Sequence, residues 1–142
     1  MTLWVLDASV VIKWFIPEGD RAAAMALRVS SARFAAPDLL FVELSNIVWK
    51  LVKRSEIEPE PAAAIIHAIS TAPWLVHSNQ SLARDATDLA LASGVSASGA
   101  SYVALAMRLN TRCITADRKL IERLRGTAAT KHVKLLAETI VH

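Results

Sequence analysis

Cysteine is almost missing from this chain, and its scarcity excludes several kinds of site. Cys113 is the single cysteine in 142 residues, so an internal disulfide and a cysteine-based zinc site are both excluded. It stands in an apolar run typical of a strand, where we expect a buried and unreactive thiol. A lone thiol is also consistent with a reducing cytoplasm, where we expect the protein to reside.

Signals for export and for membrane insertion are also missing. The first residues, MTLWVLDASVV, lack a basic segment and include Asp7, so they do not read as a signal peptide. Two long uncharged runs, 61–83 and 89–107, are broken by proline, glycine and polar residues. Neither resembles a membrane span, and we expect no membrane partner.

Acidic residues are scarce in the last third of the chain, which makes the charge uneven. The formal net charge is +3, and residues 100–142 hold eight Lys or Arg against three Asp or Glu. Residues 1–99 hold eight Lys or Arg against ten Asp or Glu. A basic end on a nearly neutral body suits a polyanionic partner such as nucleic acid. An ordinary solvated basic surface explains the same distribution equally well.

Short apolar runs rich in strand-forming residues alternate with helical patterns along the whole chain. This alternation predicts one α/β domain over residues 1–142, with its core at about 3–136. We expect a central parallel sheet of four to five short strands, covered by helices on both faces. The expected strands are 3–7, 33–37, 74–78, 112–115 and 132–136, and the expected helices are 8–16, 19–33, 38–54 (capped by Asp38), 59–72, 81–93, 98–109 and 117–125.

Three acids fall at one edge of the predicted sheet. Asp7 ends the first expected strand, Asp117 follows the strand 112–115, and Glu43 lies in the first turns of the helix after another strand. In open parallel sheets the ligand site lies beyond the carboxyl ends of the strands. Asp7 and Asp117 also suit plain helix caps, the commoner role for a lone aspartate. Clustered carboxylates, however, imply a bound cation or raised pKa values.

The side chains around these acids favour metal-assisted phosphate chemistry. Oxygen ligands without paired His or Cys suit Mg²⁺ or Mn²⁺, and the four histidines, His67, His77, His132 and His142, show no ligand spacing. The helix that carries Glu43 presents one polar stripe, which also contains Asn46, Lys50, Lys53 and Arg54. A solvent-facing seam explains this stripe as well as a binding face does. Ser9 and Thr115 are placed to orient the carboxylates.

Three stretches of the chain resemble a known family in order and spacing. They are VLDASVVIKWFIPE, APDLLFVELSNIVWKLVKR and SYVALAMRLNTRCITADRKL, and together they are similar to the PIN-domain ribonucleases, especially the VapC-type toxins. The resemblance extends from about residue 3 to residue 125. It implies a three-layer α/β/α fold, Mg²⁺- or Mn²⁺-dependent endonuclease action on RNA, a homodimer and a cognate VapB-like antitoxin.

The resemblance also assigns roles to individual residues. The catalytic and metal-binding acids of the family fall on Asp7, Glu43 and Asp117, and Ser9, Asn46 and Thr115 match their usual polar neighbours. Glu18 matches a residue common in the subgroup, with an open role. The expected contacts to the RNA backbone come from basic residues, chiefly Lys50, Arg112, Arg118 and Lys119.

One position departs from the family pattern. The family carries an acid before its Tyr-Val-Ala-Leu-Ala segment, and Gly99 stands there in this chain. Two functions therefore stay open: an RNA endonuclease with reduced or lost activity, and a non-catalytic PIN-like protein that binds RNA or an antitoxin. A phosphoaspartate domain is a third class, but the dehalogenase form of it needs a second acid where Ser9 stands.

Overall fold

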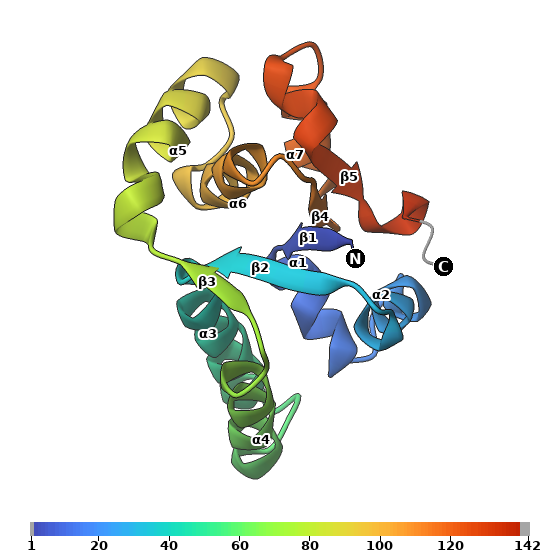
Figure 1. Cartoon of the computed structure of the whole chain (residues 1–142). Helices are drawn as coiled ribbons and strands as arrows, with labels where there is room; N and C mark the ends of the chain where they lie inside the picture. The colour runs from blue at the N-terminus through green and yellow to red at the C-terminus, as the bar shows by residue number, and fades with distance from the viewer. Residues whose placement is uncertain (1, 140–142) are drawn as a thin grey trace.

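A computed structural model describes residues 2–139 and shows a five-stranded sheet in the order β3-β2-β1-β4-β5 (Figure 1). Every pair of neighbouring strands is parallel. The strands are β1 (Leu3–Leu6), β2 (Arg33–Pro37), β3 (Leu75–His77), β4 (Cys113–Thr115) and β5 (Val133–Leu135). The helices are α1 (Ala8–Val11), α2 (Arg21–Val29), α3 (Leu39–Lys53), α4 (Pro59–Ser70), α5 (Asn79–Ser93), α6 (Ala97–Arg108) and α7 (Arg118–Leu124), with 3-10 turns η1 (Ile12–Trp14), η2 (Ala128–His132) and η3 (Leu136–Glu138).

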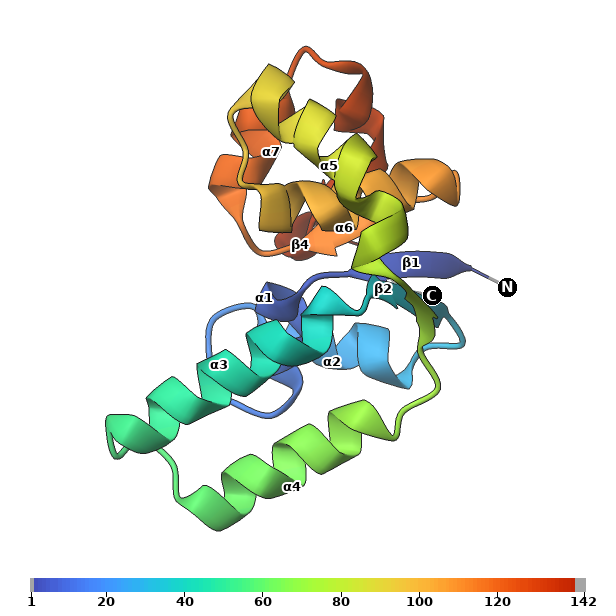
Figure 2. The same cartoon turned by 90° about the vertical axis from the view of Figure 1, so that its left-hand side faces the viewer.

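The helices form two layers, one on each face of the sheet. Figures 1 and 2 agree that α1 to α4 lie below the sheet and that α5, α6 and α7 lie above it. Burial on both faces explains why the strands read as continuous apolar runs, and all of β4 is buried. The predicted three-layer α/β/α fold is confirmed. The domain bounds of 1–142 stay a prediction, and Met1 and residues 140–142 lie outside the described residues.

Each expected strand and helix is present, with boundaries that move for local reasons. The expected helix 8–16 is α1 followed by the 3-10 turn η1. The expected helix 19–33 shortens to α2, because Asp20 takes a left-handed conformation with φ 64° and cannot continue the helix backward. At the other end, Ser30 is extended, which is incompatible with further helix.

Asp38 stands at the N-cap position of α3, as predicted, but its side chain makes no capping hydrogen bond to that helix. The Asp38 carboxylate instead accepts a hydrogen bond of 3.0 Å from the backbone N–H of Asn79, the first residue of α5. The Asn79 side chain in turn accepts one of 2.8 Å from the N–H of Leu39, the first residue of α3. The Asp38 side chain thus accepts from the first N–H of α5, and the Asn79 side chain accepts from the first N–H of α3. This exchange joins the starts of α3 and α5 beside the carboxyl ends of β2 and β3.

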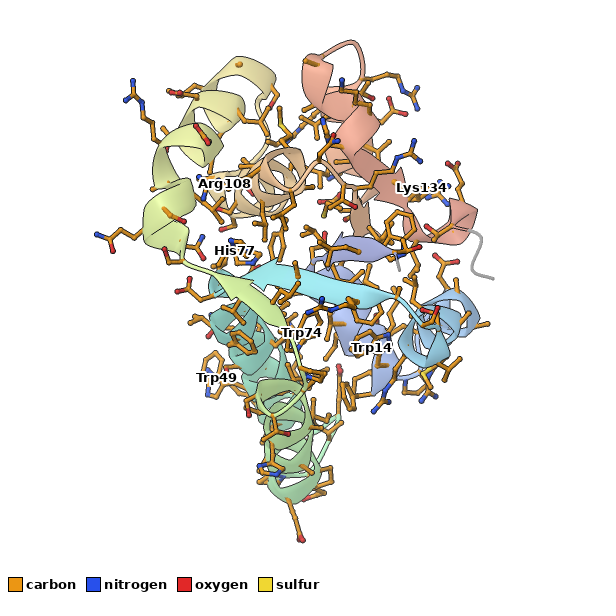
Figure 3. All side chains as sticks on the ribbon, viewed as in Figure 1. Trp14, Trp49, Trp74, His77, Arg108 and Lys134 are labelled. Carbon is orange, nitrogen blue, oxygen red and sulfur yellow. The ribbon has the colours of Figure 1, made fainter. Side chains whose placement is uncertain are left out.

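Three aromatic rings pack below the sheet near the amino ends of β2 and β3. Trp14, Phe34 and Trp74 have ring centroids 5.7–6.1 Å apart (Figure 3 labels the two tryptophans). The indole N–H of Trp14 donates to the Ala24 carbonyl at 2.8 Å, and that of Trp74 donates to the Ile69 carbonyl at 3.0 Å. A cavity of about 370 Å³ opens beside these rings, at the sheet edge opposite the acids.

Helix α6 passes through the core, with seven consecutive buried residues from Ala100 to Ala106. Gly94 ends α5 in a left-handed conformation with φ 81°, which suits glycine. Over residues 2–139, no single helix is long and apolar enough to cross a membrane. Helices α5 and α6 have that length and apolarity only when taken together, and the pair is bent by 115°.

Candidate acidic site

Asp7 is a buried acid at the carboxyl end of the central strand β1. Its side chain is 8% exposed and caps α1 by accepting a 3.1 Å hydrogen bond from the Ser9 N–H. The Ser9 hydroxyl also donates to Asp7. Burial raises the pKa of Asp7 from 3.8 to about 6, and the charge of Glu43 adds to this rise, while hydrogen bonds from Ser9 and Thr115 oppose it. An anion kept in such surroundings favours a nearby positive charge.

Glu43 approaches the same point from α3. The Tyr102 hydroxyl, on α6, donates a hydrogen bond of 2.5 Å to Oε1 of Glu43. Burial and the contact with Glu43 raise the pKa of Tyr102 far above its ordinary value, so the hydroxyl stays protonated and remains a donor. Tyr102 was not among the residues predicted for the site, because its sequence context is that of a buried helix.

Asp117 caps α7 at the same edge of the sheet. Its Oδ1 accepts hydrogen bonds from the N–H groups of Lys119 and Leu120, at 3.0 and 3.3 Å. The Thr115 hydroxyl accepts the Asp117 N–H at 3.0 Å, and the Ser9 hydroxyl accepts the Ala116 N–H at 3.0 Å. Ser9 therefore links the Asp7 carboxylate to the loop that carries Asp117.

The carboxylates fit a hard divalent cation with few protein ligands. Residues 2–139 contain no group of three or more His, Cys, Asp or Glu side chains arranged to hold one ion. Glu43 lies close enough to Asp7 for its charge to raise the pKa of Asp7, and oxygen donors suit Mg²⁺ or Mn²⁺. Mg²⁺ is commonly held by one or two carboxylates and several waters, so the pair suits such an ion without forming a closed cage.

Gly99 lies in the first turn of α6, where nothing in the backbone requires glycine. Its φ is not positive, and its N–H donates at 3.1 Å to the hydroxyl of the cap residue Ser96. A Cβ at this position would lie 3.3 Å from that hydroxyl and 3.5 Å from Cδ1 of Leu120 in α7. A larger side chain therefore fits after a small shift of Ser96, and it would emerge beside the first turn of α7, which Asp117 caps.

The predicted basic residues divide between the two edges of the sheet. Arg118 and Lys119 are exposed in the first turn of α7, next to Asp117. Lys50 is exposed on α3, as is Asn46. Arg112 precedes β4, and its carbonyl accepts the N–H of Val5 in β1. It therefore lies at the amino edge, and the structure separates it from the acids.

Two further groups have structural contacts. Glu18 pairs with the nearly buried Lys13 at 3.3 Å, which ties the loop after η1 to that turn. His132 is buried, and its Nδ1 lies 2.8 Å from the Thr111 carbonyl. His142 lies outside the described residues.

Comparison with known proteins gives a consistent result over nearly the whole chain. A profile of the PIN domain matches residues 5–138. Ribonuclease VapC3 from Pyrobaculum aerophilum is 32% identical over 126 residues, which cover 84% of this chain and 92% of that relative.

Two solved structures share the fold. The crystal structure of PAE2754 from Pyrobaculum aerophilum has a TM-score of 0.61 at 18% identity, and the match covers 96% of this chain and 85% of that one. A toxin–antitoxin complex from Klebsiella pneumoniae has a TM-score of 0.65 at 17% identity, and the match covers 98% of this chain and 100% of that one. The resemblance drawn from the three sequence motifs is thus confirmed, and the chain belongs to the PIN-domain family.

Proposed function

We propose that the protein is a metal-dependent RNA endonuclease of the VapC toxin type, with activity reduced by Gly99. The observation that carries the proposal is the buried Asp7, whose pKa is raised to about 6 beside Glu43 at the carboxyl edge of the sheet. A buried anion with a raised pKa next to a second carboxylate is typical of a functional site. The similarity to a relative named ribonuclease VapC3 supports RNA as the substrate.

In this proposal Asp7 and Glu43 would hold one Mg²⁺ or Mn²⁺ ion, and Asp117, at the same edge of the sheet, would add negative charge nearby. When bound, the ion would lower the pKa of a water molecule and stabilise negative charge on the phosphate. Ser9 orients the Asp7 carboxylate through its N–H and hydroxyl. Thr115 holds the backbone of Asp117. Asn46 is exposed one turn beyond Glu43, where its amide is placed to bind a phosphate oxygen or a water.

The RNA backbone is proposed to lie across α3 and the start of α7. Arg118 and Lys119 are exposed next to Asp117, and Lys50 is exposed further along the helix that carries Glu43. Contacts of this kind neutralise phosphates without reading the base sequence, so binding should weaken as salt increases. Arg112 lies at the opposite edge of the sheet, and we leave it out of this surface.

Gly99 leaves the site without the acid that other family members carry. Losing a partner of a metal ligand typically lowers metal affinity or activity roughly 10–100-fold, and losing a ligand should lower them at least as much. The second candidate function is a PIN-like protein that binds RNA or an antitoxin without cleaving. The lack of a three-residue ligand group over residues 2–139 favours this candidate.

Cleavage of structured RNA in Mn²⁺ separates the two candidates. Gly99→Asp should cleave at least about 10-fold faster than the unchanged chain, and Asp7→Asn in the Gly99→Asp background should abolish that gain. Gly99→Asn is the matched control, since it adds a side chain of the same size without charge. If neither the unchanged chain nor Gly99→Asp cleaves RNA, the nuclease function is excluded.

We also propose an antitoxin partner at the aromatic cavity, in a cytoplasmic setting. Phe15 and Arg28 line the cavity, and the Arg28 guanidinium lies 5.0 Å from the centroid of the Phe15 ring. An amphipathic helix with an acidic edge would match these apolar and basic groups. Phe15→Ser should weaken capture of a purified VapB-like antitoxin, whereas Val29→Ser, exposed on the neighbouring α2, should not.

The homodimer is proposed to form through α3 and the edge strand β3. Val42 and Trp49 lie two helical turns apart on α3 and are 62% and 57% exposed, and Val76 on β3 is 49% exposed. Figure 1 shows α3 and β3 on the same side of the molecule. Trp49→Lys should shift sedimentation toward the monomer, whereas Leu91→Lys, at an exposed position on α5, should leave it unchanged.

A further inference from the structure

Tyr102 is the one tyrosine of the chain, and it lies buried at the acidic edge. Its hydroxyl reaches a carboxylate that is 59 residues away in the sequence. Glu43 comes from α3 below the sheet and Tyr102 from α6 above it, as Figures 1 and 2 show. The hydrogen bond therefore joins the two helical layers at the place where Asp7 ends the central strand.

A glutamate on a partly exposed helix face needs a partner to stay in one position. Glu43 has three rotatable side-chain bonds, and Asn46, on the same polar stripe, is exposed to solvent. Water and the repulsion between Glu43 and Asp7 both favour an outward orientation of the Glu43 carboxylate. A hydrogen bond from a hydroxyl to a carboxylate is about twice as strong as a bond between neutral groups, and the Tyr102 ring is fixed by its packing, at 2% exposure.

We propose that Tyr102 is the positioning residue of this site and that its hydroxyl holds the Glu43 carboxylate beside Asp7 before any cation binds. The hydroxyl engages one of the two carboxylate oxygens, which leaves the other for a cation. Gly99 lies one turn earlier on α6 and supplies no acid. Helix α6 therefore contributes to the site through the Tyr102 hydroxyl, which preorganises a ligand carried by α3.

The catalytic consequence rests on the proposed nuclease function, but the positioning itself is measurable in the metal-free protein. Tyr102→Phe removes the hydroxyl and keeps the ring. In protein labelled with ¹³C at glutamate carboxyl groups, this change should move the Glu43 resonance to the position of a solvent-exposed glutamate such as Glu56. Ser101→Ala is the matched control, because the Ser101 hydroxyl on the same helix donates to Ala97 within that helix. An unmoved Glu43 resonance in Tyr102→Phe would overturn the proposal, as would an equal shift in Ser101→Ala.

A second variant tests the same bond from the carboxylate side and leaves the tyrosine in place. Because the chain has a single tyrosine, its Raman ring vibrations report the state of one hydroxyl. Glu43→Ala should remove the signature of a strong donor, and Asp117→Ala should leave it intact. A spectrum that Glu43→Ala does not change would contradict the proposed contact.

Cleavage assays then measure what the positioning contributes. In the Gly99→Asp background, Tyr102→Phe should slow RNA cleavage about 10-fold, and adding it to Glu43→Ala should cause no further loss. If the ring mattered only for packing, Tyr102→Phe would cleave at the full rate, which would refute a positioning role. Absence of cleavage by both the unchanged chain and Gly99→Asp would refute the nuclease, while the carboxyl resonance and the Raman spectrum would still decide the role of Tyr102.

Discussion

Replacing Asp7 with asparagine should stabilise the protein at pH 8 while destroying the proposed site. The folded-state pKa of Asp7 is about 6, and the ordinary value is 3.8. Between these values the folded protein binds more protons at Asp7 than the unfolded chain does. The contribution of Asp7 to stability is therefore full below about pH 3.8 and is lost as the pH rises through 6.

The size of the effect follows from the pKa shift. One pKa unit corresponds to about 1.4 kcal/mol, so a rise of about two units corresponds to about 3 kcal/mol of lost stability at pH 8. Asparagine carries no charge, and its side-chain oxygen can still accept the hydrogen bond from the Ser9 N–H that caps α1. Asp7→Asn should therefore match the unchanged chain near pH 4 and exceed its unfolding free energy by up to about 3 kcal/mol at pH 8.

Urea unfolding followed by tryptophan fluorescence measures this difference, because Trp14 and Trp74 pack within the fold. Unfolding curves at pH 4, 5, 6, 7 and 8 for both proteins give the gap as a function of pH. Mg²⁺ at ten times its Kd should raise the stability of the unchanged chain by about 1.4 kcal/mol at pH 8 and that of Asp7→Asn by less. A gap that stays constant with pH, or a less stable Asp7→Asn at pH 8, would refute the reasoning.

Three further predictions concern other parts of the molecule. Gly99→Ala should raise the unfolding free energy by about 0.5 kcal/mol, because the position is helical, and a lower melting temperature would show that Ser96 cannot move aside. Asp38→Ala and Asn79→Ala should each lower the unfolding free energy by about 1 kcal/mol. The loss in the double variant should differ measurably from the sum of the two, because both caps join the same two helix starts. Strictly additive losses in urea unfolding would argue against this coupling. Lys119→Gln should reduce the salt dependence of RNA binding by about one unit of slope, whereas Arg112→Gln should leave it unchanged, and the reverse pattern in filter-binding assays would move the RNA to the opposite edge.

The layout of the fold was predictable because it depends on local patterns. Buried parallel strands read as apolar runs, and the intervening helices carry their own periodicity. The ends of each predicted strand and helix therefore lie within a few residues of the ends in the structure. The carboxyl edge of the sheet followed from the same alternation: Asp7 follows β1, Asp117 follows β4, and Glu43 on α3 lies near enough to Asp7 to raise its pKa.

Contacts between distant segments were not predictable in the same way. Asp38 and Asn79 are both good caps, and only the packing of α3 against the start of α5 decides that each serves the other's helix. The pairing of Tyr102 with Glu43 depends on two layers meeting around the edge of the sheet, and a single sequence carries no signal for such a pair. Arg112 looked similar to Arg118 in sequence, but the strand between them puts the two at opposite edges.

Calorimetric titration with Mn²⁺ tests the central claim, that this edge is a cation site weakened by Gly99, most directly. The account predicts weak binding to the unchanged chain, at least about 10-fold tighter binding to Gly99→Asp, and loss of that gain when Asp7→Asn is added. Equal affinity of the unchanged chain and Gly99→Asp, or binding that survives Asp7→Asn, would contradict it.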